Sequence, residues 1–467
     1  MARQSSPAAR ARPSPSAANA GGPTEPLIDE LCQAFANFVE PFRELFKSGR
    51  HCVLSTAQQY ACGLVQAEKR NMERMVEAVP NSNYQVLQNF LTHSSWAWRA
   101  VMDLVAHLAA ALLIGLGPVS LNIDGSAFSK KGIYSVGVAR QHNGRLGKED
   151  NCQVGVFGAL AAGIRVAIIA AHLYLPKDWT DDPTRCELAG VPRADQVHRT
   201  KLELAQEIVR HADEIGLRYE WVGVDSEFGH SLEFLEALET GGKTFLADIH
   251  ANRHIYLIDP DPHLPPQGLG RKRVRYHSKA KPVEVRKWVE QQAASRWKKM
   301  TLRESTRGQL TVEIIHQRVW LWDKCSERAH CWHLVVRREI KSPDTIKYSL
   351  SNATEGTSVM KLAQMQAQRF WIERAFQDAK SNLGMAQYQA RGWDSWHHHM
   401  ALVMMAALFM LQMRIGNEET YPLLSCYDIQ ILLAKSLPDR RDSPAELIRQ
   451  MLHRHEQRQA AIDRYSG

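Results

Sequence analysis

The chain has 467 residues, of which 44% are hydrophobic and 23% charged, and its net charge at pH 7 is +8. This length allows about three domains of ordinary size, and the composition is that of a soluble globular protein, which excludes collagen-like, coiled-coil and wholly disordered chains. The eight cysteines form no C-x-x-C pair and show no regular spacing. Neither a disulfide framework nor a zinc module is therefore expected. A cytoplasmic location is expected.

The first part of the chain is predicted to be helical after a disordered tail. Residues 1–25 are rich in Ala, Ser, Pro and Arg, with no acidic residue before Glu25, which is typical of a disordered basic segment. From residue 26 to 117, apolar residues recur at three- and four-residue spacing, as at Leu27, Leu31 and Phe35. This period predicts a helical N-terminal domain.

The pattern changes to strands at Pro118. The segment Val119–Asp124 alternates between apolar and polar residues, which predicts a strand. Further strands are predicted at Tyr134–Ala139, Gln153–Phe157, Arg165–Leu175, Tyr219–Asp225 and Thr244–Ile249, with helices at Ala194–Ile215 and Ser231–Leu238. Antiparallel strands followed by strands that alternate with helices predict an α/β sheet across residues 118–259.

Beyond residue 259 we expect three more segments. Residues 260–356 are basic and β-rich and form a predicted insertion, residues 357–415 hold two helices, and residues 416–467 form a helical tail. Gly384 is expected to stop the first of the two helices, and Asp394 to cap the second. The apolar runs at 104–123 and 400–413 are broken or too short, and neither is predicted to span a membrane.

The positive charge is concentrated in one stretch of the chain. Residues 268–303 contain 12 Lys and Arg residues against two acids, Glu284 and Glu290. A solvated loop is the simpler interpretation, but like charges at this density repel one another unless a counter-charge is present. We therefore expect this stretch to follow a nucleic-acid backbone, with DNA contacts from its most basic part, Arg271, Lys272, Arg273 and Arg275.

Two aspartates end predicted strands of the sheet. Asp124 closes the strand that begins at Val119, and Asp225 closes the strand that begins at Tyr219. Carboxylates at the carboxyl ends of strands in an open α/β sheet face the crevice where ligands bind. Either aspartate alone would more simply cap a turn.

A third acid lies on the predicted helix at 358–383. Glu373 has Arg369 four residues before it and Lys380 seven residues after it, so the three side chains share one helical face. A surface ion-pair stripe is the alternative, but Trp371, Ile372 and Phe376 crowd around the acid. Asp124, Asp225 and Glu373 could together hold two Mg²⁺ ions for phosphoryl displacement.

These residues resemble the DDE transposases of bacterial insertion sequences, in the group with a Y-x2-R-x3-E-x6-K signature and closest to the insertion-sequence 701 branch. Arg369, Glu373 and Lys380 fit the signature, whereas Gln366 stands at its Tyr position. Six further stretches are similar to blocks of the family: Tyr60–Asn71, Ile123–Gly132, Ser135–Gln141, Gly147–Gln153, Val224–Gly229 and Trp393–His399.

The resemblance implies an RNase H-like catalytic core, interrupted by the β-rich insertion and preceded by a helical DNA-binding domain at 26–117. It implies that Asp124, Asp225 and Glu373 ligate Mg²⁺, with Mn²⁺ substituting, and that Arg369 and Lys380 hold phosphates. The implied reaction is metal-dependent cleavage of double-stranded DNA at the terminal inverted repeats, followed by transfer of the 3′-OH end to target DNA. The implied assembly is a homodimer associated with the bacterial nucleoid, without a membrane.

Two other functions stay open from the sequence. One is a non-catalytic DNA-binding relative, domesticated or decayed, to which the Gln366 departure gives slight support. The other is a nuclease with an RNase H-like fold and no strand-transfer activity. The presence of all three acids favours the active transposase.

Overall fold

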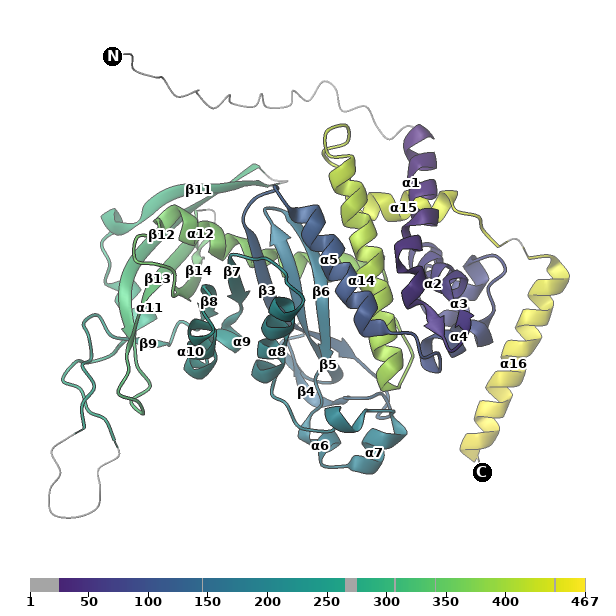
Figure 1. The fold of residues 1–467 in the computed structure, drawn as a ribbon, viewed down its shortest axis with the longest axis horizontal. Coiled ribbons are helices and arrows are strands. Elements are labelled where there is room, and N and C mark those ends of the chain that lie inside the picture. The colour runs from purple at the N-terminus through teal and green to yellow at the C-terminus, as the bar shows by residue number, and fades with distance from the viewer. Residues whose placement is uncertain are drawn as a thin grey trace.

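The computed structural model describes residues 25–144, 146–264, 275–305, 308–340, 342–440 and 442–466. A ten-stranded mixed sheet lies beside a group of helices from both ends of the chain (Figure 1). The predicted tail, except for Glu25, lies outside the described residues.

The N-terminal segment is helical, as its sequence period predicts. Leu27, Leu31 and Phe35 are buried on one face of the first helix. They belong to a continuous apolar core that also includes the sheet and the long helix α14 (Trp393–Gly416). The elements of this segment are α1 (Glu25–Phe38), η1 (Glu40–Leu45), β1 (Lys47–Ser48), β2 (His51–Cys52), α2 (Leu54–Gln66), α3 (Met72–Ala78), α4 (Tyr84–Thr92) and α5 (Trp98–Leu113).

The first half of the sheet combines antiparallel and parallel strands around β3. Strand β3 pairs antiparallel with β5 and parallel with β7, and β7 pairs parallel with β8. The α/β prediction for this region is confirmed. The strands are β3 (Val119–Ser129), β4 (Ala139–Asn143), β5 (Lys148–Ala162), β6 (Arg165–Leu173), β7 (Trp221–Val224) and β8 (Phe245–Ile249).

Several predicted boundaries in this half are wrong. The strand predicted to close at Asp124 continues to Ser129, because its pairing with β5 continues to that residue, so Asp124 lies within β3 and not at its end. The strand predicted at 134–139 is mostly a turn, because Gly137 has a φ of +73°, and β4 begins only at Ala139. The helix predicted from Ala194 begins at Lys201, because Thr200 and Glu203 form a capping box there. The helices are α6 (Lys177–Thr180), α7 (Pro183–Leu188), η2 (Arg193–Asp195), α8 (Lys201–Glu214), α9 (Ser226–Gly229) and α10 (Leu232–Thr240).

The β-rich segment continues the same sheet. Strand β14 pairs antiparallel with β8, so the strand order is β11-β12-β13-β14-β8-β7-β3-β5-β4, with β6 paired to β5. The order of the strands therefore places this segment next to β8, which separates it from β7, the strand that Asp225 follows. Its elements are β9 (His254–Ile255), β10 (Val283–Glu284), α11 (Val285–Glu290), η3 (Ala294–Arg296), β11 (Lys298–Ser305), β12 (Gly308–Leu321), β13 (His330–Glu339) and β14 (Ser342–Ser351).

The single helix predicted at 358–383 is divided at Arg369 into α12 (Val359–Gln368) and α13 (Phe370–Asn382). Gly384, with a φ of +66°, ends α13 as predicted. Helix α14 (Trp393–Gly416) is capped by Gly392, so the predicted cap Asp394 instead lies in its first turn. Helices α15 (Cys426–Ser436) and α16 (Pro444–Ser466) complete the described chain.

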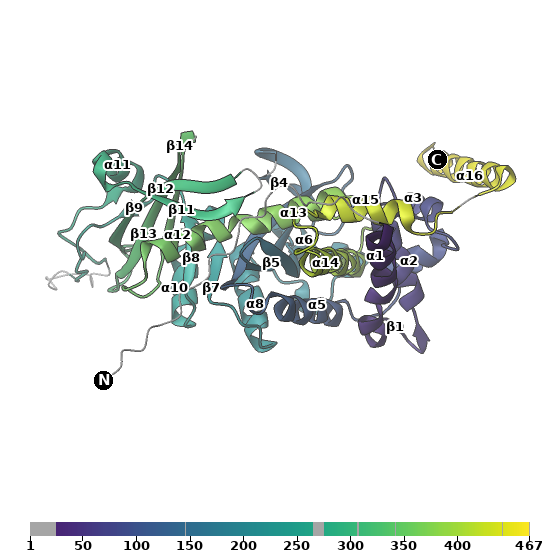
Figure 2. The same cartoon turned by 90° about the horizontal axis from the view of Figure 1, so that it is seen from above.

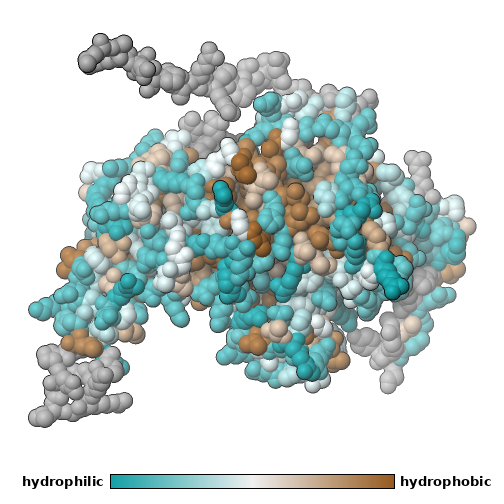
Figure 3. Space-filling model, in the orientation of Figure 1, coloured by the Kyte–Doolittle hydropathy of each residue, from teal (hydrophilic) through white to brown (hydrophobic). Residues whose placement is uncertain are grey.

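Helix α14 is long and apolar enough to cross a membrane, but 67% of its most apolar stretch is buried inside the protein. Figure 2 views α14 down its axis, with α5 on one side and α13 on the other. This is the position of a core helix. Hydrophobic residues also gather over α5 on the face shown in Figure 3. Ile114, which directly follows α5, is 76% exposed.

Candidate active site

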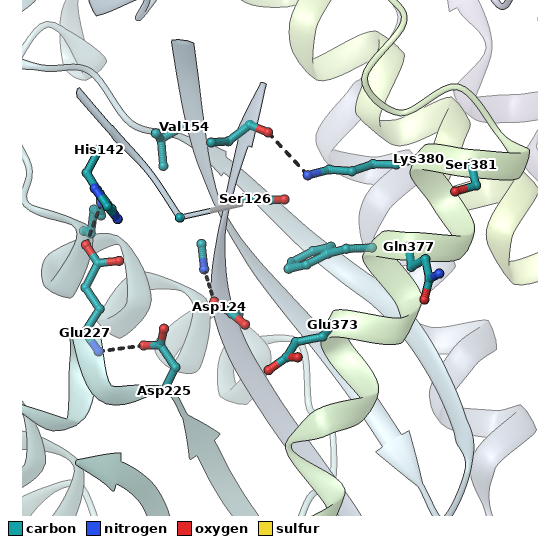
Figure 4. Close-up of a pocket in the computed structure, with 15 residues that line it drawn as sticks. Asp124, Ser126, His142, Val154, Asp225, Glu227, Glu373, Gln377, Lys380 and Ser381 are labelled. Atoms are coloured by element: carbon teal, nitrogen blue, oxygen red, sulfur yellow. Dashed lines mark hydrogen bonds and ion pairs between the residues drawn. The ribbon is translucent and has the colours of Figure 1, made fainter. Parts of the chain in front are cut away.

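The three predicted acids line one cavity of about 540 Å³. Asp124 comes from β3, Asp225 follows β7 directly, and Glu373 lies in the first turn of α13. Figure 4 shows their carboxylates directed toward one another across this cavity. Residues separated by almost 250 positions in sequence thus converge because β3 and β7 are parallel neighbours and α13 crosses them.

Asp124 and Asp225 are both held by backbone donors. The Gly125 N–H donates to Oδ1 of Asp124 at 2.7 Å. The N–H groups of Glu227 and Phe228 donate to Oδ1 of Asp225 at 2.9 and 3.3 Å, so Asp225 caps the short helix α9 and faces the cavity as well. Asp225 therefore caps a helix, as a lone aspartate often does, and also lines the cavity.

Burial makes these two carboxylates hard to ionise. The pKa of Asp124 is raised to about 8, by burial first and then by the negative charge of Asp225, although Arg369 opposes the rise. The pKa of Asp225 is also raised, chiefly by burial, and is again opposed by Arg369. A site that disfavours negative charge in this way gains free energy when a cation enters it.

Arg369 is the internal counter-ion of the site. Its Nη2 donates to Oε1 of Glu373 at 2.7 Å, its Nε donates to Oδ2 of Asp248 at 2.7 Å, and its Nη1 lies 3.6 Å from Oδ2 of Asp124. The Arg369 side chain is only 7% exposed. Burial by itself would lower the pKa of Arg369, but the surrounding carboxylates outweigh that effect and raise it.

The predicted DNA-contacting residues are placed very differently. Lys380 lines the cavity, and its Nζ donates to the Ala127 carbonyl at 3.3 Å. Arg369 faces inward, and its Nη1 is buried without a hydrogen bond to any described residue. Arg275 is exposed and does not line the cavity. Arg271, Lys272 and Arg273 lie outside the described residues.

Several polar residues in or beside the cavity were missed from the sequence. Lys201 and Glu227 line the cavity and form an ion pair at 2.5 Å. Glu227 follows Asp225 by two residues and could have been suspected, whereas Lys201 reaches the site only because α8 begins there. Asp248, on β8, lies behind Arg369, and no local pattern marks it.

The donor set suits a hard divalent cation, because it consists of carboxylate oxygens. Among the described residues, no three His, Cys, Asp or Glu side chains surround a single point closely enough to hold an ion. The arrangement is instead one of pairs, with Asp124 between Asp225 and Glu373. These residues fit a metal shared between two carboxylates. The pKa of Asp124 is raised first by burial and then by the charge of Asp225, so an entering cation would favour the ionised carboxylate.

Comparison with known proteins also points to an endonuclease. A model of the family described as DDE superfamily endonuclease matches residues 42–309, a range that includes Asp124 and Asp225 and ends before Glu373. The chain is 26% identical over 239 residues to a protein of Microchaete diplosiphon named as a probable transposase for insertion sequence element IS701. That similarity covers 50% of this chain and 57% of the relative.

Proposed function

Because the chain belongs to the DDE superfamily of endonucleases, we propose that it is the transposase of a bacterial insertion sequence. It cleaves double-stranded DNA at the ends of its element and transfers the freed 3′-OH to target DNA. The observation that carries this proposal is the convergence of Asp124, Asp225 and Glu373 on one cavity. The likeness to the IS701 protein supports the choice of a transposase over other endonucleases.

The catalytic core that we propose is RNase H-like and consists of residues 118–259 and 357–415. The support is its arrangement of strands: β3 carries the first acid between antiparallel β5 and parallel β7, and α13 brings the third acid across them. The N-terminal helical domain at 26–117 would contact the terminal inverted repeat. The segment at 260–356 is proposed as the insertion, and 416–467 as a C-terminal tail that contributes to dimerisation.

Asp124 and Asp225 would hold one Mg²⁺ ion, and Asp124 and Glu373 a second, with Mn²⁺ able to replace either. When bound, such ions activate the attacking oxygen and stabilise the leaving oxygen of a phosphodiester. The side chains of Lys380 and Lys201 line the same cavity and place positive charge beside the position of a phosphate. The backbone donors at Gly125 and Glu227 fix the two aspartates before the substrate arrives.

The partners that we propose are the terminal inverted repeats, target DNA and a second copy of the chain. The basic stretch supports the DNA contact, because the described part of it exposes Arg275, Lys279, Lys281, Arg286, Lys287, Arg296, Lys298 and Lys299. In the proposed synaptic dimer, each subunit would cut the end that the other holds. The protein would act in the cytoplasm, on the nucleoid.

The test uses labelled duplexes of the DNA that flanks the coding sequence on either side. Binding and nicking are measured with Mg²⁺ or with EDTA, for the wild type and for Asp124→Asn, Asp225→Asn and Glu373→Gln. Asp378→Asn is the matched control, because Asp378 lies on the same helix as Glu373 but pairs with Arg374 instead of lining the cavity.

We expect nicking that needs Mg²⁺, that is lost in the three site variants and that persists in the control, with DNA binding retained throughout. Nicking that survives in all three site variants would refute the proposed site. Binding without nicking by the wild type in both Mg²⁺ and Mn²⁺ would favour the non-catalytic relative. Failure of a pre-cut 3′-OH end to join target DNA, with nicking intact, would favour a simple nuclease.

A further inference from the structure

A further carboxylate lies behind the three predicted acids of the cavity. Asp248 is on β8, the neighbour of the second-aspartate strand, and its side chain is 13% exposed. One of its oxygens, Oδ2, accepts the bond from Nε of Arg369 at 2.7 Å, and the other, Oδ1, accepts a bond from the Ser349 hydroxyl at 2.5 Å. Both oxygens are therefore engaged, and Asp248 is held from two sides.

Ser349 connects this pair to the residue that departs from the transposase signature. Ser349 on β14 is the cross-strand partner of Asp248 and is completely buried. Nε2 of Gln366 donates to the Ser349 Oγ at 2.7 Å. Gln366 is itself 3% exposed, so its side chain does not face solvent or DNA in this structure.

The donors and acceptors of this chain of bonds follow in one consistent direction. The Gln366 amide donates to Ser349, the Ser349 hydroxyl donates to Asp248, and Arg369 donates both to Asp248 and to Glu373. An arginine can donate and cannot accept, and a carboxylate can accept and cannot donate when ionised. Each donor in this chain of bonds therefore faces an acceptor. The two bonds that Arg369 donates fix the plane of its guanidinium group.

The backbone of Asp248 is also fixed by a close contact. A Cβ atom at Gly229, the last residue of α9, would lie 2.1 Å from the Asp248 carbonyl oxygen. Only glycine allows α9 to approach β8 this closely. Because Asp225 caps the same short helix, this contact holds the Asp225 loop and Asp248 in register.

We propose that Asp248 is a positioning residue of the active site, which holds the Arg369 guanidinium to one side of the carboxylates so that a divalent cation can enter between them. Ser349 and Gln366 support Asp248 in this role. The inference rests on the proposed function, and it gives the glutamine at the signature's Tyr position a task inside the protein.

The physical reason is competition between two cations for the same oxygens. With Asp248 in place, Nη1 of Arg369 stays 3.6 Å from Asp124 and makes no hydrogen bond. Without the Asp248 charge, the ion pairs that the buried guanidinium keeps among the described residues are those with Glu373 and Asp124. It would then turn toward these two carboxylates and occupy the oxygens that a metal ion needs.

The test compares Asp248→Asn and Ser349→Ala with Ser351→Ala. Ser351 is the matched control, because it is a fully buried serine on the same strand whose hydroxyl donates to the Phe245 carbonyl and not to Asp248. Two quantities are measured for each full-length protein: the dissociation constant for Mn²⁺ by calorimetry without DNA, and the Mn²⁺ concentration at half-maximal nicking of the end duplex.

We expect Asp248→Asn to raise both quantities about 10- to 100-fold, the range found when a group that orients metal ligands is removed. Ser349→Ala should raise both by a smaller factor, and Ser351→Ala should leave both unchanged. Saturating Mn²⁺ should restore most of the nicking rate in Asp248→Asn, because the cation then displaces Arg369.

Wild-type values in both Asp248→Asn and Ser349→Ala would overturn the inference while leaving the proposed function intact. An equal loss of rate at every Mn²⁺ concentration would overturn it too, since that result indicates general disruption and not competition. If Asp248→Asn does not fold, Ser349→Ala against Ser351→Ala decides the question. A wild type that neither binds Mn²⁺ nor nicks DNA would overturn the proposed function, and this inference with it.

Discussion

Replacing Asp124 by asparagine should make the metal-free protein more stable at alkaline pH, although it removes a residue that the proposed reaction requires. Asparagine has almost the same shape and keeps an oxygen for the Gly125 N–H. It lacks the negative charge that burial and Asp225 disfavour. The expected gain therefore comes from charge alone.

The size of the effect follows from the pKa of Asp124, which is about 8 in the folded protein against 3.8 for an unperturbed aspartate. At about 1.4 kcal/mol for each pH unit by which ionisation is made harder, the ceiling is about 6 kcal/mol at pH values above 8. Below about pH 4, Asp124 is protonated in both the folded and unfolded states and the effect vanishes. Between these limits the unfolded state loses the proton first, so wild-type stability falls as the pH rises.

The assay is thermal unfolding of wild type and Asp124→Asn in EDTA at pH 5, 6.5 and 8.5, with Asp378→Asn as the control. We expect the Tm of Asp124→Asn to exceed that of wild type by several degrees at pH 8.5, and the difference to shrink steadily toward pH 5. Adding Mn²⁺ at pH 8.5 should raise the wild-type Tm and reduce the difference. A variant that is less stable than wild type at pH 8.5, or a difference that does not change with pH, would refute the electrostatic argument.

Two further predictions concern packing and DNA affinity. Gly223→Ala should destabilise the protein by about 1–3 kcal/mol, because its Cβ would lie 2.3 Å from Oδ1 of the buried Asn122. Adding Asn122→Ala should relieve much of that cost in the double variant. Shifts in the denaturation midpoint that simply add in the double variant would contradict the clash. Replacing Arg275, Lys279 and Lys281 together by glutamine should lower the slope of log affinity for duplex DNA against log salt by up to about 0.9 for each lost phosphate contact, and an unchanged slope would remove this stretch from the DNA path.

The acids of the site were predictable because each carries a local signal. The apolar alternation from Val119 marks the strand that carries Asp124, although Asp124 lies within that strand and not at its end. Asp225 follows the end of its strand directly, and Glu373 shares a helical face with two cations. Parallel pairing of the strands and the crossing helix then bring them together. The placement of Arg369 was not predictable in the same way, since helical spacing fixes its face but not whether that face meets DNA or buried acids.

What decides the orientation of Arg369 is Asp248, which is 121 residues away in sequence. Asp248 lies at this point because β8 pairs with β7, and Ser349 lies opposite it because β14 pairs with β8. No local pattern encodes the β14–β8 pairing. The burial of Gln366 follows from the same pairing, through Ser349. Charge density likewise marks the basic stretch as one that needs a counter-charge, but it does not place that stretch relative to the cavity.

The central claim, that Asp124, Asp225 and Glu373 form a metal-dependent catalytic centre, is tested most directly by locating the metal. Crystals of the protein soaked in Mn²⁺ would be measured at the manganese absorption edge, and anomalous difference maps calculated for wild type and Glu373→Gln. The account predicts anomalous peaks within ligand distance of these three carboxylates in wild type, with the peak beside residue 373 weakened in the variant. A map with no peak in this cavity at saturating Mn²⁺, or with peaks only elsewhere on the protein, would contradict it.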